Sequence, residues 1–244
     1  MKSCKGIVIA EQKLGESSKR VVMYTDNYGK VTLYAKGAYG KNSGILAATS
    51  MFCMSQFELN ESENFHYIKR SEILDVHYDL SNSFERLIYA SFVAELVYRA
   101  TMEEEKNPKA FMLLEKTLNV MEAYDPKLTA ITFGIKFVSL IGYLPVTKGC
   151  IYCGTKDVRM FSSKEGGYIC EEHLANLSVE TYKEGIFVTP EEVKILNILL
   201  YNTYEEIFKW DFDTASLNNV FNTILNYIRE NLDINKFNSL TFVS

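Results

Sequence analysis

The sequence predicts an α+β protein in which a five-stranded β-barrel is followed by a helical domain with an inserted Cys3His metal knuckle. Five short strand-like stretches fall within residues 5–76, and the hydrophobic period then changes to that of a helix. Two pairs of metal-ligand residues, Cys150 with Cys153 and Cys170 with His173, lie farther along the chain. We therefore expect a barrel domain over 1–78 and a helical domain over 79–244, with the metal module at about 146–176.

The barrel is predicted from runs of β-branched and aromatic residues separated by turn residues, at 6–10, 20–25, 30–36, 51–59 and 65–74. The third run alternates: Val31, Leu33 and Ala35 face one way. Its polar residues Lys30, Thr32, Tyr34 and Lys36 face the other way. Five short strands suit a small closed barrel, for which the OB-fold is the five-stranded Greek-key solution. An SH3-like barrel fits the same pattern.

The helical domain is predicted from capping signals and apolar stripes. A helix begins near Ser83 and extends to about Glu104, a second spans about 109–124, and a third starts at Asp125-Pro126 and reaches about 142. Thr189-Pro190-Glu191-Glu192 predicts another helix start, and an apolar stripe from Leu217 to Ile228 predicts the last helix. The tail from residue 233 to 244 has no predicted structure.

The knuckle pattern consists of Cys150-x-x-Cys153 and, after sixteen intervening residues, Cys170-x-x-His173. Three thiolates and an imidazole suit Zn²⁺, and four protein ligands close its coordination shell, so we predict one structural zinc per chain. Ordinary buried cysteines beside a surface histidine are the alternative. A catalytic zinc would keep three protein ligands and an open position. The remaining cysteines, Cys4 and Cys53, lie in apolar-flanked strands and are expected in the core.

Composition restricts the class of protein. The apolar runs are too short to span a bilayer, and the cysteine pattern favours a reducing cytoplasm with no membrane association. The net charge is −5, yet residues 1–50 carry eight basic and three acidic residues. Such asymmetry points to a part that binds a polyanion. We find no G-x-S-x-G, Walker A or G-x-G-x-x-G sequence, so we do not expect an enzyme.

The basic barrel surface is the candidate nucleic-acid site. Cations along a groove neutralise phosphates, and interleaved tyrosines can stack on unpaired bases. The expected contacts are Lys19, Arg20, Lys30, Tyr34, Lys36, Tyr39 and Lys41. The alternative from pattern alone is that Tyr34 caps the barrel and the lysines only confer solubility.

Several stretches together resemble the RecO family of bacterial recombination mediators. They are, in order, 5–8 (KGIV), 15–19 (GESSK), 28–30 (YGK), 35–38 (AKGA) and 142–145 (GYLP) leading into the knuckle. The chain departs from the family where Tyr39-Gly40 replaces the arginines of many members. It also carries His173 where cysteine is common.

The resemblance implies a mediator that binds single- and double-stranded DNA non-specifically and anneals complementary strands. It also implies binding to the C-terminal tail of single-stranded-DNA-binding protein and, with RecR, help in loading RecA at the bacterial nucleoid. Lys19, Arg20, Lys30, Lys36 and Lys41 are then the DNA-contacting cations, and the four knuckle residues are the zinc ligands. A zinc-stabilised protein–protein adaptor with no direct DNA role is the alternative.

Overall fold

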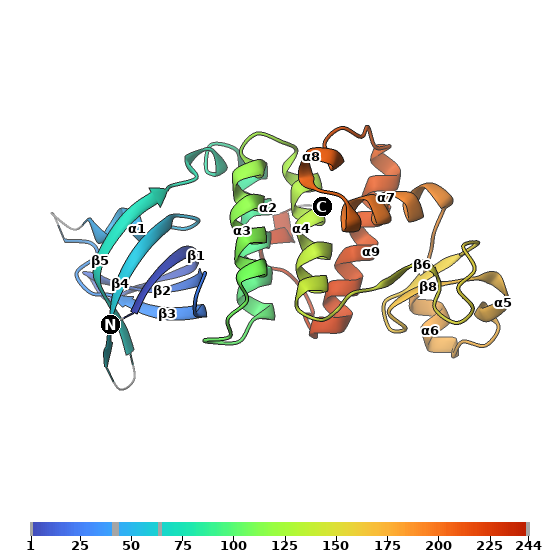
Figure 1. Cartoon of the computed structure of the whole chain (residues 1–244), viewed down its shortest axis with the longest axis horizontal. Coiled ribbons are helices and arrows are strands. Elements are labelled where there is room, and N and C mark those ends of the chain that lie inside the picture. The colour runs from blue at the N-terminus through green and yellow to red at the C-terminus, as the bar shows by residue number, and fades with distance from the viewer. Residues whose placement is uncertain (1, 41–43, 63–64, 243–244) are drawn as a thin grey trace. The chain divides into compact units, whose positions relative to one another are not determined.

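A computed structural model describes residues 2–40, 44–62 and 65–242. The chain forms two compact units, one containing residues 1–130 and 237–244 and the other containing residues 131–236 (Figure 1). The division falls inside helix α4 (Pro126–Leu140). The expected boundary at 78/79 marks a different feature, the change from strands to helices along the chain. Helices α2 (Phe84–Ala100) and α3 (Pro108–Met121) thus belong to the same compact unit as the barrel.

The barrel consists of β1 (Lys2–Leu14), β2 (Ser18–Thr25), β3 (Gly29–Ala35), β4 (Met54–Ser62) and β5 (Phe65–Asp75). The strands close in the order β1-β2-β3-β5-β4, and β1 also pairs with β4. Only β3 and β5 pair in parallel among these described strands. This topology is the OB-fold, which confirms the prediction. A short helix that the sequence did not reveal, α1 (Ile45–Ala48), lies between β3 and β4.

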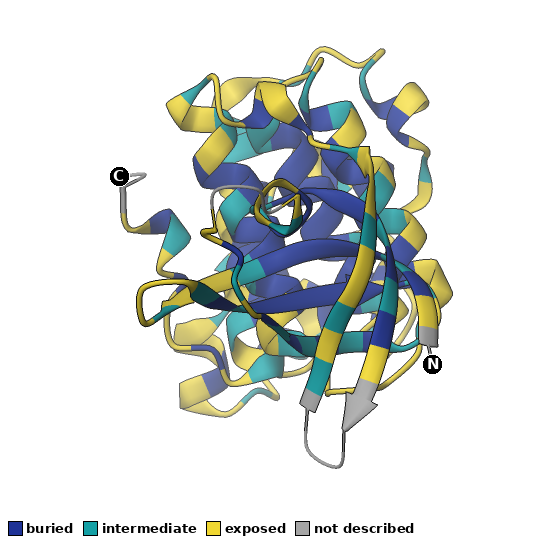
Figure 2. Cartoon of the chain, turned by 90° about the vertical axis from the view of Figure 1, so that its left-hand side faces the viewer, coloured by how far each residue is buried: buried dark blue, intermediate teal, exposed yellow. Residues whose placement is uncertain are grey.

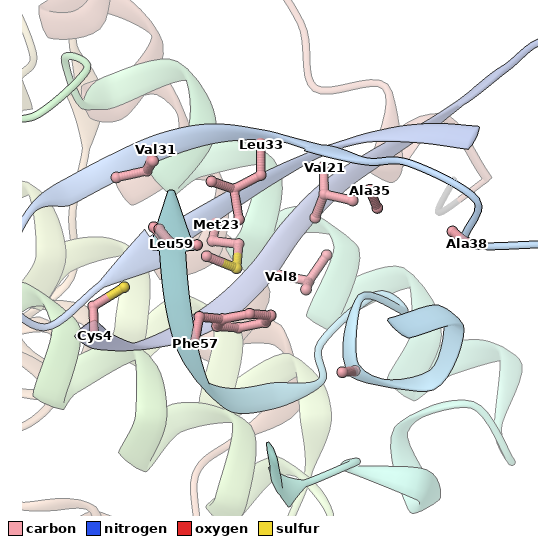
Figure 3. Packing of buried hydrophobic residues seen from close by; sticks show 11 residues of the cluster. Cys4, Val8, Val21, Met23, Val31, Leu33, Ala35, Ala38, Phe57 and Leu59 are labelled. Carbon is pink, nitrogen blue, oxygen red and sulfur yellow. The ribbon is translucent and has the colours of Figure 1, made fainter. Parts of the chain in front are cut away.

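The barrel core follows from the strict alternation of its strands. In β3, Val31, Leu33 and Ala35 point inward and pack with Phe57 and Leu59 of β4 (Figure 3). The core also contains Cys4, and Cys53 is equally buried, as predicted. A bulge in the β1–β2 pairing between Val8 and Ala10 bends β1. Figure 2 shows buried positions through the central strands and exposed ones along the β4–β5 hairpin.

Helix α2 begins where the capping signal predicted it, and α3 begins one residue earlier than expected, after a cap at Asn107. The side chains of Ser83 and Asn107 accept hydrogen bonds from the amides of Arg86 and Ala110, satisfying the open N–H groups of α2 and α3. Helix α2 packs against β1 and β2 of the barrel. It ends at Ala100, four residues earlier than expected, because the following residues run along β3 instead.

The C-terminal segment returns to the first unit and packs on α2. A short 3₁₀ helix, η2 (Ser239–Phe242), lies against α2, and another, η1 (Tyr78–Leu80), joins β5 to α2. The ring of Phe237 meets Phe92 edge to face at 4.9 Å. The Glu95 carboxylate accepts hydrogen bonds from the backbone amides of Asn238 and Ser239. The tail without a predicted structure therefore completes the core of the first unit.

The second unit combines most of α4 with a small sheet and the helices that follow it in the chain. The sheet contains β6 (Val146–Cys150), β7 (Met160–Ser162), β8 (Gly167–Ile169) and β9 (Ile186–Phe187), in the order β6-β8-β7-β9. The helices are α5 (Glu171–Leu174), α6 (Val179–Glu184), α7 (Pro190–Tyr201), α8 (Tyr204–Ile207) and α9 (Thr214–Leu232). The capping box at Thr189 is present, and the stripe residues from Val220 to Ile228 are buried. Among the described residues, no helix has the length and apolar character needed to cross a bilayer.

Candidate metal centre and nucleic-acid interface

The four knuckle residues converge on one point in the second unit. Cys150 ends β6 and Cys153 follows in a turn. Cys170 is the N-cap of α5, and His173 lies within that helix. Their donor atoms all lie within 4.8 Å of one another. The Cys153 and Cys170 sulfurs are 3.7 Å apart, and the Cys170 sulfur is 3.1 Å from His173 Nδ1.

The spacing of the Cys153 and Cys170 sulfurs fits a tetrahedral zinc. A zinc–sulfur distance of about 2.3 Å places two sulfurs of a tetrahedron about 3.8 Å apart, close to the spacing of Cys153 and Cys170. The donor set contains three sulfurs and one nitrogen, which fills four positions and leaves none for a reacting water. The residues therefore suit a structural metal rather than a catalytic one.

Two glycines allow the first ligand pair to form its turn. Gly154 has a φ of +74°, where a side chain would be strained. A Cβ on Gly149 would lie 2.5 Å from the carbonyl oxygen of Gly154, closer than a real Cβ atom comes. The tight turn directs backbone amides at the Cys150 sulfur. Burial alone would raise the pKa of this thiol, but hydrogen bonds from the amides of Cys153, Tyr152 and Cys170 outweigh it and lower the pKa to about 6.

A second layer of contacts orients the histidine. The ring of Tyr152 stacks on His173 with centroids 5.1 Å apart, and the Tyr152 hydroxyl donates to Glu165 at 3.0 Å. Below the ligands, Met160, Ile169 and Leu174 form a small buried cluster. This cluster is too small to stabilise the module by apolar burial alone. A metal bound by the four ligands would supply the missing stability.

On the barrel, the structure corrects the prediction for Lys19. Its side chain is only 2% exposed, and its ammonium group donates to the Glu11 carboxylate at 2.6 Å and to the Thr49 carbonyl at 2.9 Å. Lys19 shares the inward face of β2 with Val21 and Met23. A lysine held inside the fold is not an exposed contact for phosphate, so this prediction is wrong.

Lys30 is also engaged inside the first unit. It lies on the predicted outer face of β3, but its ammonium donates to the carbonyl oxygens of Tyr98 and Thr101 at the C-terminal end of α2. Burial lowers its pKa, although the carboxylate of Glu103 opposes this shift. A cation is favourable at a helix C-terminus, so the residue serves as a cap. Because its ammonium already donates two hydrogen bonds within the fold, Lys30 is a weaker candidate for a DNA contact than an exposed lysine.

An acidic segment covers this part of the outer face. After α2, Glu103 forms a β-bridge with Lys30 and accepts a hydrogen bond from the Thr32 hydroxyl at 3.0 Å. Glu104 lies 3.1 Å from His66 Nε2 on β5. These carboxylates repel a polyanion, so this part of the outer face is unfavourable for a nucleic acid.

The remaining predicted residues on β2 and β3 do come together. Arg20 lies directly opposite Tyr34 in the antiparallel pairing of β2 with β3, so both project from the outer face. Lys36 follows β3 and is exposed. Tyr34 and Lys36 line a cavity of about 250 Å³ together with Ser18 and Tyr67. We call Arg20, Tyr34, Lys36 and Tyr67 the tyrosine–cation patch.

Two predicted residues remain, Tyr39 and Lys41. Tyr39 is 41% exposed, and the Lys13 ammonium lies over its ring, 5.4 Å from the centroid. Lys41 lies outside the described residues. The loop after β3 thus extends the row of aromatic and basic side chains from Lys36 to Tyr39.

Sequence reasoning missed Tyr67. It lies in the predicted fifth strand, but only the parallel pairing of β3 with β5 places it beside Tyr34. In an OB-fold the third and fifth strands pair to close the barrel, so the predicted topology could have shown that Tyr67 lies near Tyr34.

The chain is thus an OB-fold protein. Its barrel carries a basic and aromatic outer patch, and a thiolate–imidazole cluster that could hold a metal lies farther along the chain. Two family models match in tandem along the chain. The model described as Recombination protein O N terminal matches residues 1–77, and the one described as Recombination protein O C terminal matches residues 81–241. The chain belongs to the RecO family.

Individual relatives agree with this assignment. The DNA repair protein RecO of Alkaliphilus metalliredigens (strain QYMF) is 32% identical over 239 residues, which cover 96% of this chain and 95% of that protein. The DNA repair protein RecO of Acetivibrio thermocellus is 26% identical, covering 98% of this chain and 94% of the relative. That of Caldanaerobacter subterraneus subsp. tengcongensis is 27% identical, with 93% and 92% covered.

Proposed function

We propose that the chain is a DNA-repair mediator that binds DNA through the tyrosine–cation patch and does not act as an enzyme. The observation that carries the proposal is the convergence of Arg20, Tyr34 and Lys36 on the outer barrel face of a RecO-family chain. The binding is non-specific, because these side chains offer charge and ring faces rather than a pattern of base-edge contacts.

Annealing of complementary strands follows from the same chemistry. Two DNA backbones repel each other, and cations that screen both strands reduce the work of bringing them together. In the proposed role, the protein holds a strand coated by single-stranded-DNA-binding protein through that protein's C-terminal tail. It then acts with RecR so that RecA takes over the strand. The knuckle holds one Zn²⁺ that stabilises the second unit and takes no part in chemistry at DNA.

The test is a salt titration of binding to single-stranded and duplex oligonucleotides. We expect log affinity to fall linearly with log salt for both. The double variant Arg20→Ala/Lys36→Ala should weaken binding to all sequences about equally. Its slope for single strands should be shallower by about 0.7 for each phosphate that the variant no longer neutralises. The matched control Lys109→Ala/Lys156→Ala removes two exposed lysines outside the patch and should leave the slope unchanged.

A flat salt dependence, or equal slopes for the patch variant and the wild type, would contradict the proposal. A second candidate then gains weight, a zinc-stabilised adaptor with no direct DNA role. It is favoured by the engagement of Lys19 and Lys30 inside the fold, which removes two cations from the predicted surface. Capture of partners from a nuclease-treated lysate separates the two: partners retained unchanged, without DNA binding by the pure protein, support the adaptor.

A further inference from the structure

The inference concerns two tyrosines on neighbouring strands of the barrel. The parallel pairing of β3 with β5 sets Tyr34 directly beside Tyr67. Their ring centroids are 6.4 Å apart, and their planes are inclined by 43°, so the rings form an open wedge rather than a closed stack. Both line the cavity of about 250 Å³, whose other lining residues are Ser18 and Lys36.

We infer that Tyr34 and Tyr67 form a cradle for one unpaired base, and that Tyr67 makes the protein distinguish single-stranded from duplex DNA. This inference rests on the proposed function. It gives the patch a preference for single-stranded over duplex DNA, which its charges alone do not supply. Cations neutralise the phosphates of either form of DNA, whereas a tyrosine ring can stack only on a base whose face is free.

The dimensions of the cavity agree with a single base. Pockets for drug-sized ligands have volumes of about 300–1,000 Å³, so this smaller cavity suits one flat ring system. A duplex keeps both faces of each base covered by its neighbours and cannot insert one without unstacking it, which costs a few kcal/mol. The geometry therefore admits a single strand and excludes a duplex from the cradle, although not from the cations around it.

The surroundings give the strand a path. Lys36 lies in the cavity wall, and Arg20 projects from the same face as Tyr34, so cations flank the rings where phosphates would run. On one side the acidic segment begins at Glu103, which is bonded to Thr32 two residues before Tyr34. The strand is thus directed from the cradle toward Lys36 and Tyr39, and away from Lys30.

The Tyr67 ring is not part of the barrel core. Its side chain is 37% exposed on the outer face of β5, while the adjacent Ile68 packs against the buried cluster inside. A substitution at this position removes the ring without opening a cavity in the barrel.

The test compares Tyr67→Ala with Tyr67→Phe at one fixed salt concentration, on single-stranded and duplex oligonucleotides of equal length. We expect Tyr67→Ala to weaken single-strand binding by about 5- to 140-fold, the loss that one base–aromatic contact produces. Duplex binding should change by less than about twofold, and Tyr67→Phe should behave as wild type because it keeps the ring. The control Tyr78→Ala removes an exposed tyrosine of the same unit and should change neither affinity.

A direct readout follows the base itself. A single 2-aminopurine in the oligonucleotide should lose fluorescence on stacking with wild type and Tyr67→Phe, and should keep it with Tyr67→Ala. An equal loss of single-strand and duplex binding in Tyr67→Ala, or no loss in either, overturns the cradle. If Tyr67→Ala is without effect while Arg20→Ala/Lys36→Ala still flattens the salt slope, the cradle fails and the proposed function stands. If wild-type protein does not bind DNA, both fail.

Discussion

At the scale of single residues, lysines on one barrel serve different purposes. Lys19 pairs across the strands with Ala35, the residue before Lys36, yet Lys19 is buried with a carboxylate partner and Lys36 faces solvent beside the cavity. A lysine can be buried when its ammonium is paired and hydrogen-bonded, as it is here with Glu11 and Thr49. Charge counts from sequence therefore overstate the surface available to a polyanion.

Replacing Lys19 should destabilise the barrel rather than weaken DNA contacts directly. Lys19→Ala leaves the Thr49 carbonyl without its partner and the Glu11 carboxylate unpaired. Because Glu11 is about one-third exposed and partly screened, we expect a loss of about 1–3 kcal/mol in the free energy of unfolding. Urea unfolding of Lys19→Ala beside Lys36→Ala checks this, since Lys36→Ala should stay within about 0.5 kcal/mol of wild type. Equal stability of both variants would restore Lys19 as a surface residue.

The alternation of β2 and β3 could have predicted the position of Lys19. Val21 and Met23 are inward, and the period of two puts residue 19 on the same face once the strand is extended to Ser18. The role of Lys30 could not be read in the same way. Its partners Tyr98 and Thr101 lie about seventy residues away in sequence, and no local pattern carries such a contact.

At the scale of elements, the knuckle was the most predictable part of the chain. Ligand spacing and turn glycines act locally, so Cys150, Cys153, Cys170 and His173 come together as expected. The helix caps at Ser83 and Thr189 were predictable for the same reason. The small sheet around the knuckle was not, because strands of two to five residues carry little periodicity.

Metal removal should unfold the knuckle and spare the barrel. We expect about one zinc per chain in protein purified without added metal, because the four donors fill a tetrahedral shell. A chelator should abolish hydrogen-exchange protection across β6, β7 and β8 while leaving β1 to β5 protected. Cys170→Ser should reproduce the chelator effect, and Cys53→Ser, at a buried cysteine outside the cluster, should retain the metal. Metal-free protein with full protection in the small sheet would contradict the role of zinc.

At the scale of the whole molecule, the chain order does not follow the compact units. The first unit is built from two separate stretches, and the second is inserted between them. The change from strands to helices is visible in the sequence, but the return of Phe237 to α2 is not. It depends on the fit of one ring against Phe92 and on amides that meet Glu95.

The attachment of the tail should depend on pH through Glu95. Burial alone would raise the pKa of this carboxyl, but hydrogen bonds from Ser239 and Asn238, together with Arg99, outweigh it and hold the pKa below its usual range. Stability from a lowered carboxyl pKa is fully present above the ordinary value of about 4.3 and is lost as pH falls through the folded-state value. Glu95→Gln should therefore be less stable than wild type at neutral pH, and the difference should shrink in acid. Urea unfolding of both proteins at a series of pH values measures this difference, and a gap that is independent of pH would count against the anchoring role.

The discontinuous first unit has a consequence for the order in which the protein matures. Residues 131–236 form one uninterrupted stretch of the chain, so the second unit contains all its own residues without Phe237. The barrel unit lacks Phe237 until that whole stretch has been made, so its last packing step comes after the synthesis of the second unit. A chain that ends at residue 236 would therefore contain the whole second unit but a first unit without the ring that packs on α2.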